Sequence, residues 1–274
     1  MNRFEKICKE IKEVKIQGAE NIAEAALRAL QIKNNDEAKL KLISLRPTEP
    51  KLQNAIKYAE RFGIEASLRK MKENRERIQK EGAKILKKRN KIFTHCHSST
   101  VISIIEQGLK EKKEIEVYNT ETRPLYQGRR TSKDLARLKI PNTFLVDSAM
   151  RIGIKRSDIV LLGADAILAN GKVINKIGSE LVAETAQRFR KKLYICTSSW
   201  AFDPRSLHHL ETPMEYRDTK EVWKNAPKNI RVLNPSFEKI DPRKITGIIS
   251  EFGTLKPRQF IKRIKKEEWI FSKK

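Results

Sequence analysis

Apolar residues recur with helical spacing through the first third of the chain. One repeat consists of Phe4, Ile7, Ile11 and Val14, and another of Ile22, Ala25, Ala26, Leu27 and Leu30. Such spacing is typical of amphipathic helices. Arg46-Pro47-Thr48 interrupts the pattern, and a long charged helix is expected from about Ala66 to Arg89. We therefore predict an N-terminal helical domain over residues 1–90.

From Ile92 onward, short apolar runs alternate with segments of helical character. The runs are 92–93, 115–118, 144–146, 159–162 and 193–196, and the predicted helices are 100–111, 131–138, 148–155 and 177–191. This alternation is typical of β-α-β units and a parallel sheet. The fold class expected is α/β, with a Rossmann-like, mainly parallel sheet domain over residues 91–274 that ends in a basic tail.

Polar residues follow nearly every predicted strand. They are 94–100, 119–124, 147–148, 163–165 and 197–199. The carboxyl ends of parallel strands meet at one edge of the sheet, where ligands bind in open α/β folds. We therefore expect a functional site at this edge.

Cys96 and Asp165 carry the candidate chemistry of this site. Cys96 lies between a strand and a helix start, where backbone N–H groups can lower a thiol pKa and hold a phosphate. The alternative is a buried, inert cysteine. Asp165 follows the apolar run 159–162 and Gly163, so burial can raise its pKa and keep it a proton donor. A thiolate base or nucleophile and a carboxylic acid then share one site.

Basic and amide side chains near this edge indicate an anionic ligand. Arg123 offers a fork for a phosphate or an ion pair. Asn170-Gly171 is predicted to form a hairpin turn that leads to Asn175 and Lys176 at a helix start, suited to a sugar phosphate. Gly163 is expected to let the backbone approach a ligand closely.

Other polar residues of the edge have simpler explanations. His95 and His97 flank Cys96, and alternation along an extended turn points them away from it, so we interpret them as local hydrogen-bond partners and expect no metal. Asp147 can organise the pocket or cap the following helix. His208 and His209 have no partner in the sequence that would make them catalytic.

Charge and cysteine content bear on the partners and the cellular compartment of the protein. The 59 lysines and arginines against 34 acidic residues give a formal charge of +25, spread over the predicted helices. The tail 256–274 is expected to be a solvated, frayed terminus, with nonspecific nucleic-acid affinity as the alternative. Cys8, Cys96 and Cys196 lack metal-ligand spacing, and Cys8 and Cys196 are expected core positions. With neither a signal peptide nor a membrane span in the sequence, we expect a cytoplasmic protein.

Five strings in the second half resemble one superfamily. They are Thr94-His-Cys-His-Ser-Ser, Glu121-Thr-Arg-Pro-Leu-Tyr-Gln-Gly, Val146-Asp-Ser-Ala, Gly163-Ala-Asp and Asn175-Lys-Ile-Gly. They look like the sugar-phosphate isomerases and the alpha, beta and delta regulatory subunits of translation initiation factor 2B. The presence of both Cys96 and Asp165, with the closing stretch Tyr216 to Phe237, resembles archaeal ribose-1,5-bisphosphate isomerases.

The resemblance implies conversion of ribose 1,5-bisphosphate to ribulose 1,5-bisphosphate in nucleoside salvage, without a metal or an organic cofactor. It implies that Cys96 removes the C2 proton and that Asp165 acts as the acid. It also implies substrate contacts, which fall here on Gly18, Ala19, Arg46, Ser98, Ser99, Thr100, Asn175 and Lys176. The expected partners are a phosphorylated pentose and further copies of the chain, as a dimer or a hexamer-of-dimers type assembly. The alternative is a regulatory subunit that binds a sugar phosphate or nucleotide and a translation factor.

The sequence departs from the resemblance at two basic positions. Where the isomerases usually read Arg-Gly-Ala-Gly, this chain reads Gln17-Gly18-Ala19-Glu20, and where they carry a late lysine it reads Ser199-Trp200-Ala201-Phe202. These changes remove positive charge and add a negative one. They therefore bear on the affinity of the site for phosphate and on the identity of the substrate.

Overall fold

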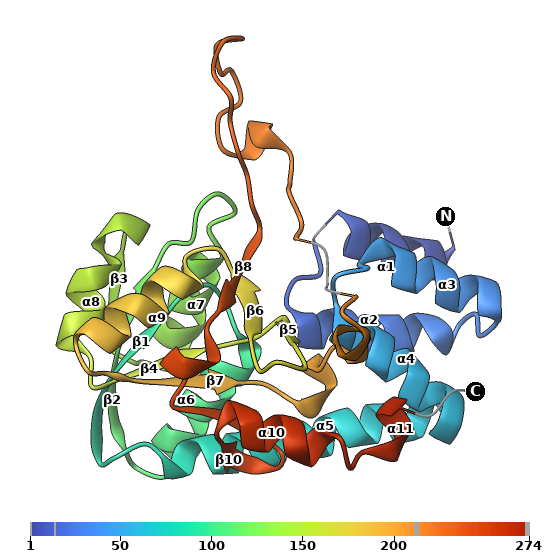
Figure 1. The fold of residues 1–274 in the computed structure, drawn as a ribbon, viewed down its shortest axis with the longest axis horizontal. Coiled ribbons are helices and arrows are strands. Elements are labelled where there is room, and N and C mark those ends of the chain that lie inside the picture. Colours follow the sequence, from blue (N-terminus) through green and yellow to red (C-terminus); the bar gives the residue numbers. More distant parts are fainter. Residues whose placement is uncertain (1, 14, 211–213, 272–274) are drawn as a thin grey trace.

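A computed structural model describes residues 2–13, 15–210 and 214–271, and shows a helical N-terminal part followed by a sheet (Figure 1). The N-terminal helices are α1 (Arg3–Lys12), α2 (Ala19–Leu30), α3 (Asp36–Leu45), α4 (Pro50–Phe62) and α5 (Ile64–Lys84). Phe4, Ile11 and Ile22 are buried among them, as the helical spacing predicts. Val14 lies outside the described residues. We place the proposed domain boundary in the turn 85–88, because the next strand already begins at Arg89.

Seven strands of the described chain form one sheet, in the order β10-β9-β7-β4-β1-β2-β3. Their bounds are β1 (Arg89–Thr94), β2 (Glu114–Thr120), β3 (Asn142–Leu145), β4 (Ile159–Leu162), β7 (Lys192–Cys196), β9 (Gly247–Ser250) and β10 (Gly253–Leu255). Neighbouring strands pair in parallel from β3 to β9, and only β10 is antiparallel. The predicted α/β class with a mainly parallel sheet is confirmed.

Both faces of this sheet are covered by helices. Successive residues of a strand point to opposite faces, and accordingly Ile92 and Phe93 of β1 belong to two different hydrophobic cores. One core contains residues of α5, α6 (Ser99–Lys110) and α7 (Gln127–Arg137). The other contains residues of α8 (Met150–Arg156) and α9 (Ser179–Arg188). The carboxyl edge of the sheet is thereby left to polar loops.

Local signals account for most differences in element bounds. The expected helix 131–138 begins earlier, at Gln127, because Gly128 packs where a Cβ would lie 1.7 Å from the Thr120 carbonyl oxygen. The expected helix 177–191 begins only at Ser179, because Gly178 adopts φ +97° and turns the chain into it. The expected strand 144–146 ends at Leu145, and Val146 is more than half exposed.

A second, antiparallel sheet lies beside the carboxyl edge of the first. It consists of β5 (Ala166–Ile167), β6 (Val173–Lys176) and β8 (Phe237–Ile240). The predicted turn at Asn170-Gly171 joins β5 to β6, with Gly171 at φ +83°. Asn175 and Lys176 therefore lie at the end of a strand, and not at the start of a helix as expected.

The segment between residues 214 and 236 projects from the body as an extended arm, coloured orange to red in Figure 1. Its base is held by Tyr216 bridging to Pro235 and by the Arg217 N–H, which donates to the Asn234 carbonyl oxygen at 2.9 Å. Several apolar side chains of the arm are exposed. They are Tyr216, Val222, Trp223, Ile230 and Leu233.

The basic tail does not behave as the charge pattern predicts. Instead of fraying, it forms α10 (Pro257–Ile264) and α11 (Glu268–Phe271), which bury Phe260, Ile264 and Ile270. Lys57 Nζ of α4 donates to the Ile270 carbonyl oxygen at 2.7 Å. The expectation of a frayed terminus is wrong for these residues because their apolar side chains have a helical spacing and a core to enter. Residues 272–274 lie outside the described range.

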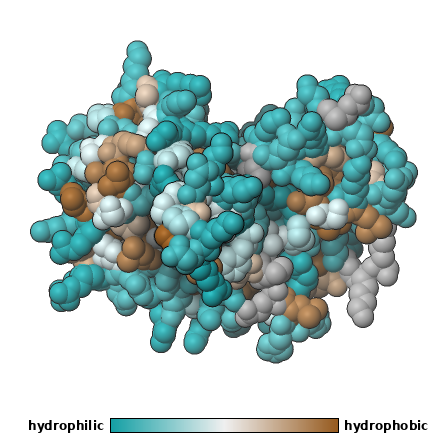
Figure 2. Space-filling model, turned by 90° about the horizontal axis from the view of Figure 1, so that it is seen from above, coloured by the Kyte–Doolittle hydropathy of each residue, from teal (hydrophilic) through white to brown (hydrophobic). Residues whose placement is uncertain are grey.

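Hydrophilic side chains cover most of the face seen in Figure 2, and apolar residues are scattered among them. Cys8 and Cys196 are buried in two different cores, as predicted. In the described part of the chain, we find no helix whose length and apolar character would let it cross a membrane.

Candidate active site

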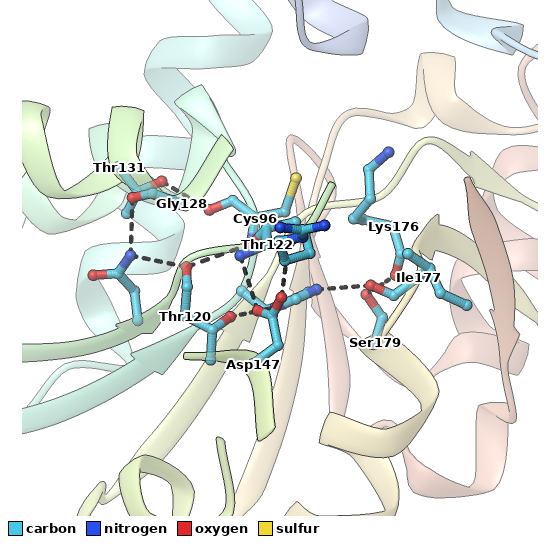
Figure 3. Close-up of polar contacts among 12 residues, drawn as sticks. Cys96, Thr120, Thr122, Gly128, Thr131, Asp147, Lys176, Ile177 and Ser179 are labelled. Atoms are coloured by element: carbon cyan, nitrogen blue, oxygen red, sulfur yellow. Dashed lines mark hydrogen bonds and ion pairs between the residues drawn. The ribbon is translucent and has the colours of Figure 1, made fainter. Parts of the chain in front are cut away.

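Cys96 lies two residues beyond the end of β1, in a left-handed backbone conformation with φ 66°. This region is uncommon for residues other than glycine and persists where the surroundings hold it. Here the backbone N–H of Cys96 donates to Thr122 Oγ1 at 2.9 Å, and its carbonyl oxygen accepts from Thr131 Oγ1 at 2.8 Å. The cysteine is therefore fixed by the loop after β2 and by α7 (Figure 3).

The loop after β2 is held in turn by Asp147. Its Oδ1 accepts from the Thr122 N–H at 2.8 Å and its Oδ2 from the Arg123 N–H at 2.7 Å. Asp147 is the first residue of the 3₁₀ turn Asp147–Ala149, and no side chain caps this turn. Of the two expected roles, organising the pocket loop is the one that the contacts support, and it reaches Cys96 through Thr122.

A single pocket at the carboxyl edge collects most of the predicted site residues. They are Gly18, Ala19, Arg46, Cys96, Ser98, Ser99, Thr100, Asp165, Asn175 and Lys176. The N-terminal helical part supplies the residues on one side of this lining. Residues at and beyond the ends of β1, β4 and β6 supply the other side. The pocket therefore joins the two parts of the chain.

Burial dominates the ionisation of the Cys96 thiol. It raises the thiol pKa to about 11, although the nearby Lys176 ammonium opposes the shift and the Asp165 carboxylate adds to it. Burial therefore outweighs the lowering of the thiol pKa that a helix start can give. The physical reason is desolvation, together with a start of α6 whose Val101 N–H is already bonded to Ser98 Oγ at 3.3 Å.

The pKa of the Asp165 carboxyl is shifted in the direction that the sequence predicts for a proton donor. Burial raises its pKa, while the cations Lys176, Arg46 and Lys51 act in the opposite direction. Its backbone N–H donates to the Ile174 carbonyl oxygen at 3.0 Å, which ties the turn after β4 to β6. A carboxyl with a raised pKa can hold a proton at higher pH and deliver it.

Gly163 lines the pocket and also packs against the start of α6. A Cβ at this position would lie 2.9 Å from Ser98 Oγ. The missing side chain thus makes room for Ser98, the cap of α6, and close approach of the Gly163 backbone to a ligand stays a prediction.

Asn175 and Lys176 approach the pocket from β6. Asn175 Nδ2 donates to Ser179 Oγ at 2.8 Å, which places the amide against the first turn of α9. The Lys176 ammonium lies 4.7 Å from the centre of the Phe237 ring, a cation–π contact. In Figure 3 the Lys176 side chain and the Cys96 sulfur project to the same side of the polar network.

Arg123 is placed outside the pocket. Its guanidinium donates to Tyr126 Oη at 2.6 Å and to the Val222 carbonyl oxygen at 3.0 Å. It therefore joins the loop after β2 to the arm. The backbone N–H of Arg123, and not its guanidinium, belongs to the hydrogen-bond network around Cys96.

The two histidines are local hydrogen-bond partners, as predicted. His95 Nε2 lies 2.8 Å from the Ile177 carbonyl oxygen, which can only accept, so this nitrogen carries a proton and Nδ1 accepts from Thr120. Burial lowers the pKa of His95, and it lowers that of His97 to about 4. Within the described residues no three His, Cys, Asp or Glu side chains gather in a way that could hold a metal ion.

Sequence reasoning missed several charged residues of the pocket. They are Glu49, Lys51, Glu215 and Arg217. Glu49 and Lys51 come from the start of α4, directly after the Arg46-Pro47-Thr48 break, and Glu215 and Arg217 come from the root of the arm. The available signal was the run of charged residues and prolines from Arg46 to Lys51.

Glu49 is the most deeply buried of these carboxylates, with 2% of its surface exposed. Its Oε1 accepts from the Arg46 guanidinium at 3.1 Å. Burial, followed by the charge of Asp165, raises its pKa to about 7. The pocket therefore holds two carboxyls with raised pKa values beside cations and a thiol, which suits proton transfer on an anionic ligand.

Comparison with known proteins gives the same relationship as the sequence strings. Ribose 1,5-bisphosphate isomerase of Pyrococcus furiosus is 36% identical over 97% of this chain and 94% of the relative. The protein of that name from Thermococcus kodakarensis is 36% identical over 95% and 93%. The solved structure of Pyrococcus horikoshii OT3 translation initiation factor eIF-2B superposes with a TM-score of 0.85 at 25% identity, covering 95% of this chain and 99% of that one.

These findings confirm the resemblance to ribose-1,5-bisphosphate isomerases within the initiation-factor 2B superfamily. The similarity runs through both the helical part and the sheet, because the alignment with the Pyrococcus furiosus protein covers 97% of this chain. The family model described as "Initiation factor 2 subunit family" matches residues 5–257, and the chain therefore belongs to that family.

Proposed function

We propose that this chain converts ribose 1,5-bisphosphate to ribulose 1,5-bisphosphate, with Cys96 as the base and Asp165 as the acid. One observation carries the proposal: Cys96 and Asp165 line one pocket together with Arg46 and Lys176. The names of the curated relatives support the same reaction, an aldose–ketose isomerisation of a phosphorylated pentose. We further propose that the reaction serves nucleoside salvage.

The reaction needs an acid and a base on one sugar. The cycle begins with Cys96 as the thiolate, formed when the thiol releases its proton to water, a loss that the nearby Lys176 ammonium favours. Asp165 donates a proton to the ring oxygen as its bond to C1 breaks, and the Cys96 thiolate removes the proton from C2, which leaves an enol between C1 and C2. The proton on sulfur then goes to C1, and the hydroxyl proton on C2 returns to Asp165 as the carbonyl forms. Both protein groups end in their starting protonation state, so the cycle consumes no cofactor.

The cations of the pocket hold the substrate during these transfers. Arg46 and Lys176 lie on opposite parts of the chain, the first at the end of α3 and the second at the end of β6. Gly18, Ala19 and the hydroxyls of Ser98 to Thr100 complete the proposed contacts. Fixing both phosphates places C2 and the ring oxygen between sulfur and carboxyl, which is where orientation accelerates the chemistry.

The test is turnover by the purified protein of ribose 1,5-bisphosphate, methylthioribose 1-phosphate and ribose 5-phosphate in parallel. We expect turnover of the first. Cys96→Ser and Asp165→Asn should each lower kcat by at least about a thousandfold while the fold, followed by circular dichroism, is retained. Turnover of only another sugar phosphate, or unchanged kcat in Cys96→Ser, contradicts the proposal.

A regulatory subunit is the second candidate, favoured by the close superposition on a structure titled translation initiation factor eIF-2B. Such a subunit would bind a sugar phosphate or nucleotide in the same pocket without converting it. Binding of ribose 1,5-bisphosphate without any turnover would support this candidate. The Cys96→Ser variant would then bind as the original protein does.

We also propose that the chain forms homo-oligomers, with the arm as a contact. The support is the exposure of Trp223, Ile230 and Leu233 on a segment that projects from the body. Apolar side chains gathered on such a segment favour contact with another surface.

A further inference from the structure

We infer that Lys51 is a phosphate-binding residue of the pocket and determines its preference for a bisphosphate over a monophosphate. The inference rests on the proposed function, because it concerns the ligand of the same site. It assigns a role to a residue that the sequence strings do not include. Lys51 belongs to the first turn of α4, on the N-terminal side of the pocket.

The Lys51 ammonium is buried without a full set of partners. The residue is 4% exposed, yet it lines the pocket. Its charge is balanced by Glu20 Oε2 at 3.5 Å, and Lys51 Nζ donates no hydrogen bond to another described residue. An ammonium carries three donors, and burying a charge is costly unless it is paired and bonded. These donors are therefore available to a ligand in the pocket.

Neighbouring polar atoms are left unsatisfied in the same way. Arg46 Nε, Glu49 Oε2 and Ser236 Oγ are buried and lack hydrogen-bond partners, and all three residues line this pocket. Most buried polar atoms in proteins have a partner, so these three exceptions show that the wall of the pocket is incompletely hydrogen-bonded. A donor set of ammonium, guanidinium Nε and hydroxyl matches phosphate oxygens.

The charge balance of the pocket requires this cation. The loop Gln17 to Glu20 brings a neutral amide and a carboxylate to the lining. Four cations line the pocket against four carboxyls. The cations are Arg46, Lys51, Lys176 and Arg217, and the carboxyls are Glu20, Glu49, Asp165 and Glu215. Without Lys51 the carboxyls would outnumber the cations, which would disfavour binding of a second phosphate.

Glu20 can release Lys51 without becoming an unpaired anion. It also lies 3.8 Å from Arg75 of α5, through Oε1. A phosphate that bonds to Lys51 therefore leaves Glu20 with the Arg75 guanidinium. The lysine itself is well positioned, because Asn54, one turn later in α4, donates to the carbonyl oxygens of Trp200 and Phe202 at 2.8 Å.

Calorimetric binding in a Cys96→Ser background tests the inference, since the ligand is not consumed. The ligands are ribose 1,5-bisphosphate, ribose 1-phosphate and ribose 5-phosphate. The variants are Lys51→Met, which keeps the aliphatic stem, Lys51→Arg, which keeps the charge, and Lys80→Met, an exposed lysine of α5 that serves as the matched control. Circular dichroism and thermal melting check that each variant is folded.

We expect Lys51→Met to weaken binding of the bisphosphate at least about tenfold, and to weaken one of the two monophosphates to a similar extent while sparing the other. Lys51→Arg should recover most of the loss, and Lys80→Met should change little. Unchanged bisphosphate affinity in Lys51→Met overturns the inference, as does an equal loss for both monophosphates or the absence of binding to any of the three ligands.

The outcome is separable from that of the proposed function. Failure of the isomerase proposal appears as a lack of turnover with Cys96 intact, whereas the role of Lys51 is read from binding. If Lys51→Met proves unfolded, Lys51→Gln replaces it in the same measurements. A position-specific loss of affinity in either variant supports phosphate contact.

Discussion

The backbone N–H of Cys96 donates to the hydroxyl oxygen of Thr122 at 2.9 Å, and both residues are in the left-handed region, with φ 66° and 61°. This hydrogen bond joins the loop after β1 to the loop after β2 at Cys96, the candidate base. Thr122 is fully buried and its own N–H is bonded to Asp147. The position of the sulfur is consequently set by the loop after β2.

We expect Thr122→Val to lower kcat at least about tenfold with a smaller change in KM. The substitution keeps the shape but leaves the Cys96 N–H without its acceptor, which costs on the order of 1–3 kcal/mol and frees the loop. Steady-state kinetics with ribose 1,5-bisphosphate measure the effect, and Thr143→Val on β3 is the control. A rise in KM alone would mean that the hydroxyl contributes to binding and not to the placement of Cys96.

Alkylation of Cys96 by iodoacetamide should be slow at pH 7 and should accelerate about tenfold per pH unit up to pH 10. The thiolate is the reactive form, and burial raises the thiol pKa to about 11. Mass spectrometry of the modified peptide follows the reaction, with Cys8 and Cys196 as buried internal controls. A rate that levels off near pH 7 would contradict the raised pKa and favour a thiolate at rest.

Stability should fall as the pH rises through Glu49's titration. The folded pKa of about 7 lies above the ordinary value of 4.5, so the folded chain holds this proton more tightly than the unfolded chain does. The contribution is fully present below pH 4.5 and is lost as the pH rises through 7. Urea unfolding between pH 5 and 9 should show that Glu49→Gln gains stability relative to the original chain at the alkaline end.

The matched control for this measurement is Glu76→Gln, an exposed position of α5. It should run parallel to the original chain across the whole range. If Glu49→Gln also runs parallel, the Glu49 carboxyl titrates near its ordinary value, and the buried carboxyl pair is not a feature of the pocket in solution.

Much of the site could be predicted because strand ends are visible in the sequence. Leu162 closes a run of four buried apolar residues, and the polar turn with Asp165 follows directly. Cys96 likewise follows the apolar run 92–93. A parallel sheet brings such turns to one edge regardless of the loop lengths between them.

The remaining features depended on contacts between distant segments. Lys51 and Glu49 reach the pocket only because α4 packs against the segment from Trp200 to Phe202, a contact made through Asn54. The raised pKa of Cys96 required its burial to be known, since a helix start and desolvation act in opposite directions. The sequence predicted that Arg123 binds a phosphate or forms an ion pair, but its guanidinium donates hydrogen bonds to Tyr126 and to Val222 of the arm.

Trp223→Asp should lower the molar mass of the particle in solution. Trp223 is 48% exposed on the arm, close to Val222, whose carbonyl oxygen accepts from Arg123 of the loop behind Cys96. If the arm contacts a second copy, a carboxylate placed in that apolar contact is desolvated without a partner and weakens it strongly. Light scattering after size-exclusion chromatography measures the mass over a range of concentrations, and Leu181→Asp, a similarly exposed position on α9, is the control.

A monomeric original chain, or a mass that neither substitution changes, would remove the arm as an oligomer contact. A mass that falls with Trp223→Asp together with lower kcat would further connect assembly to the active site, because the arm root carries Glu215 and Arg217 into the same pocket.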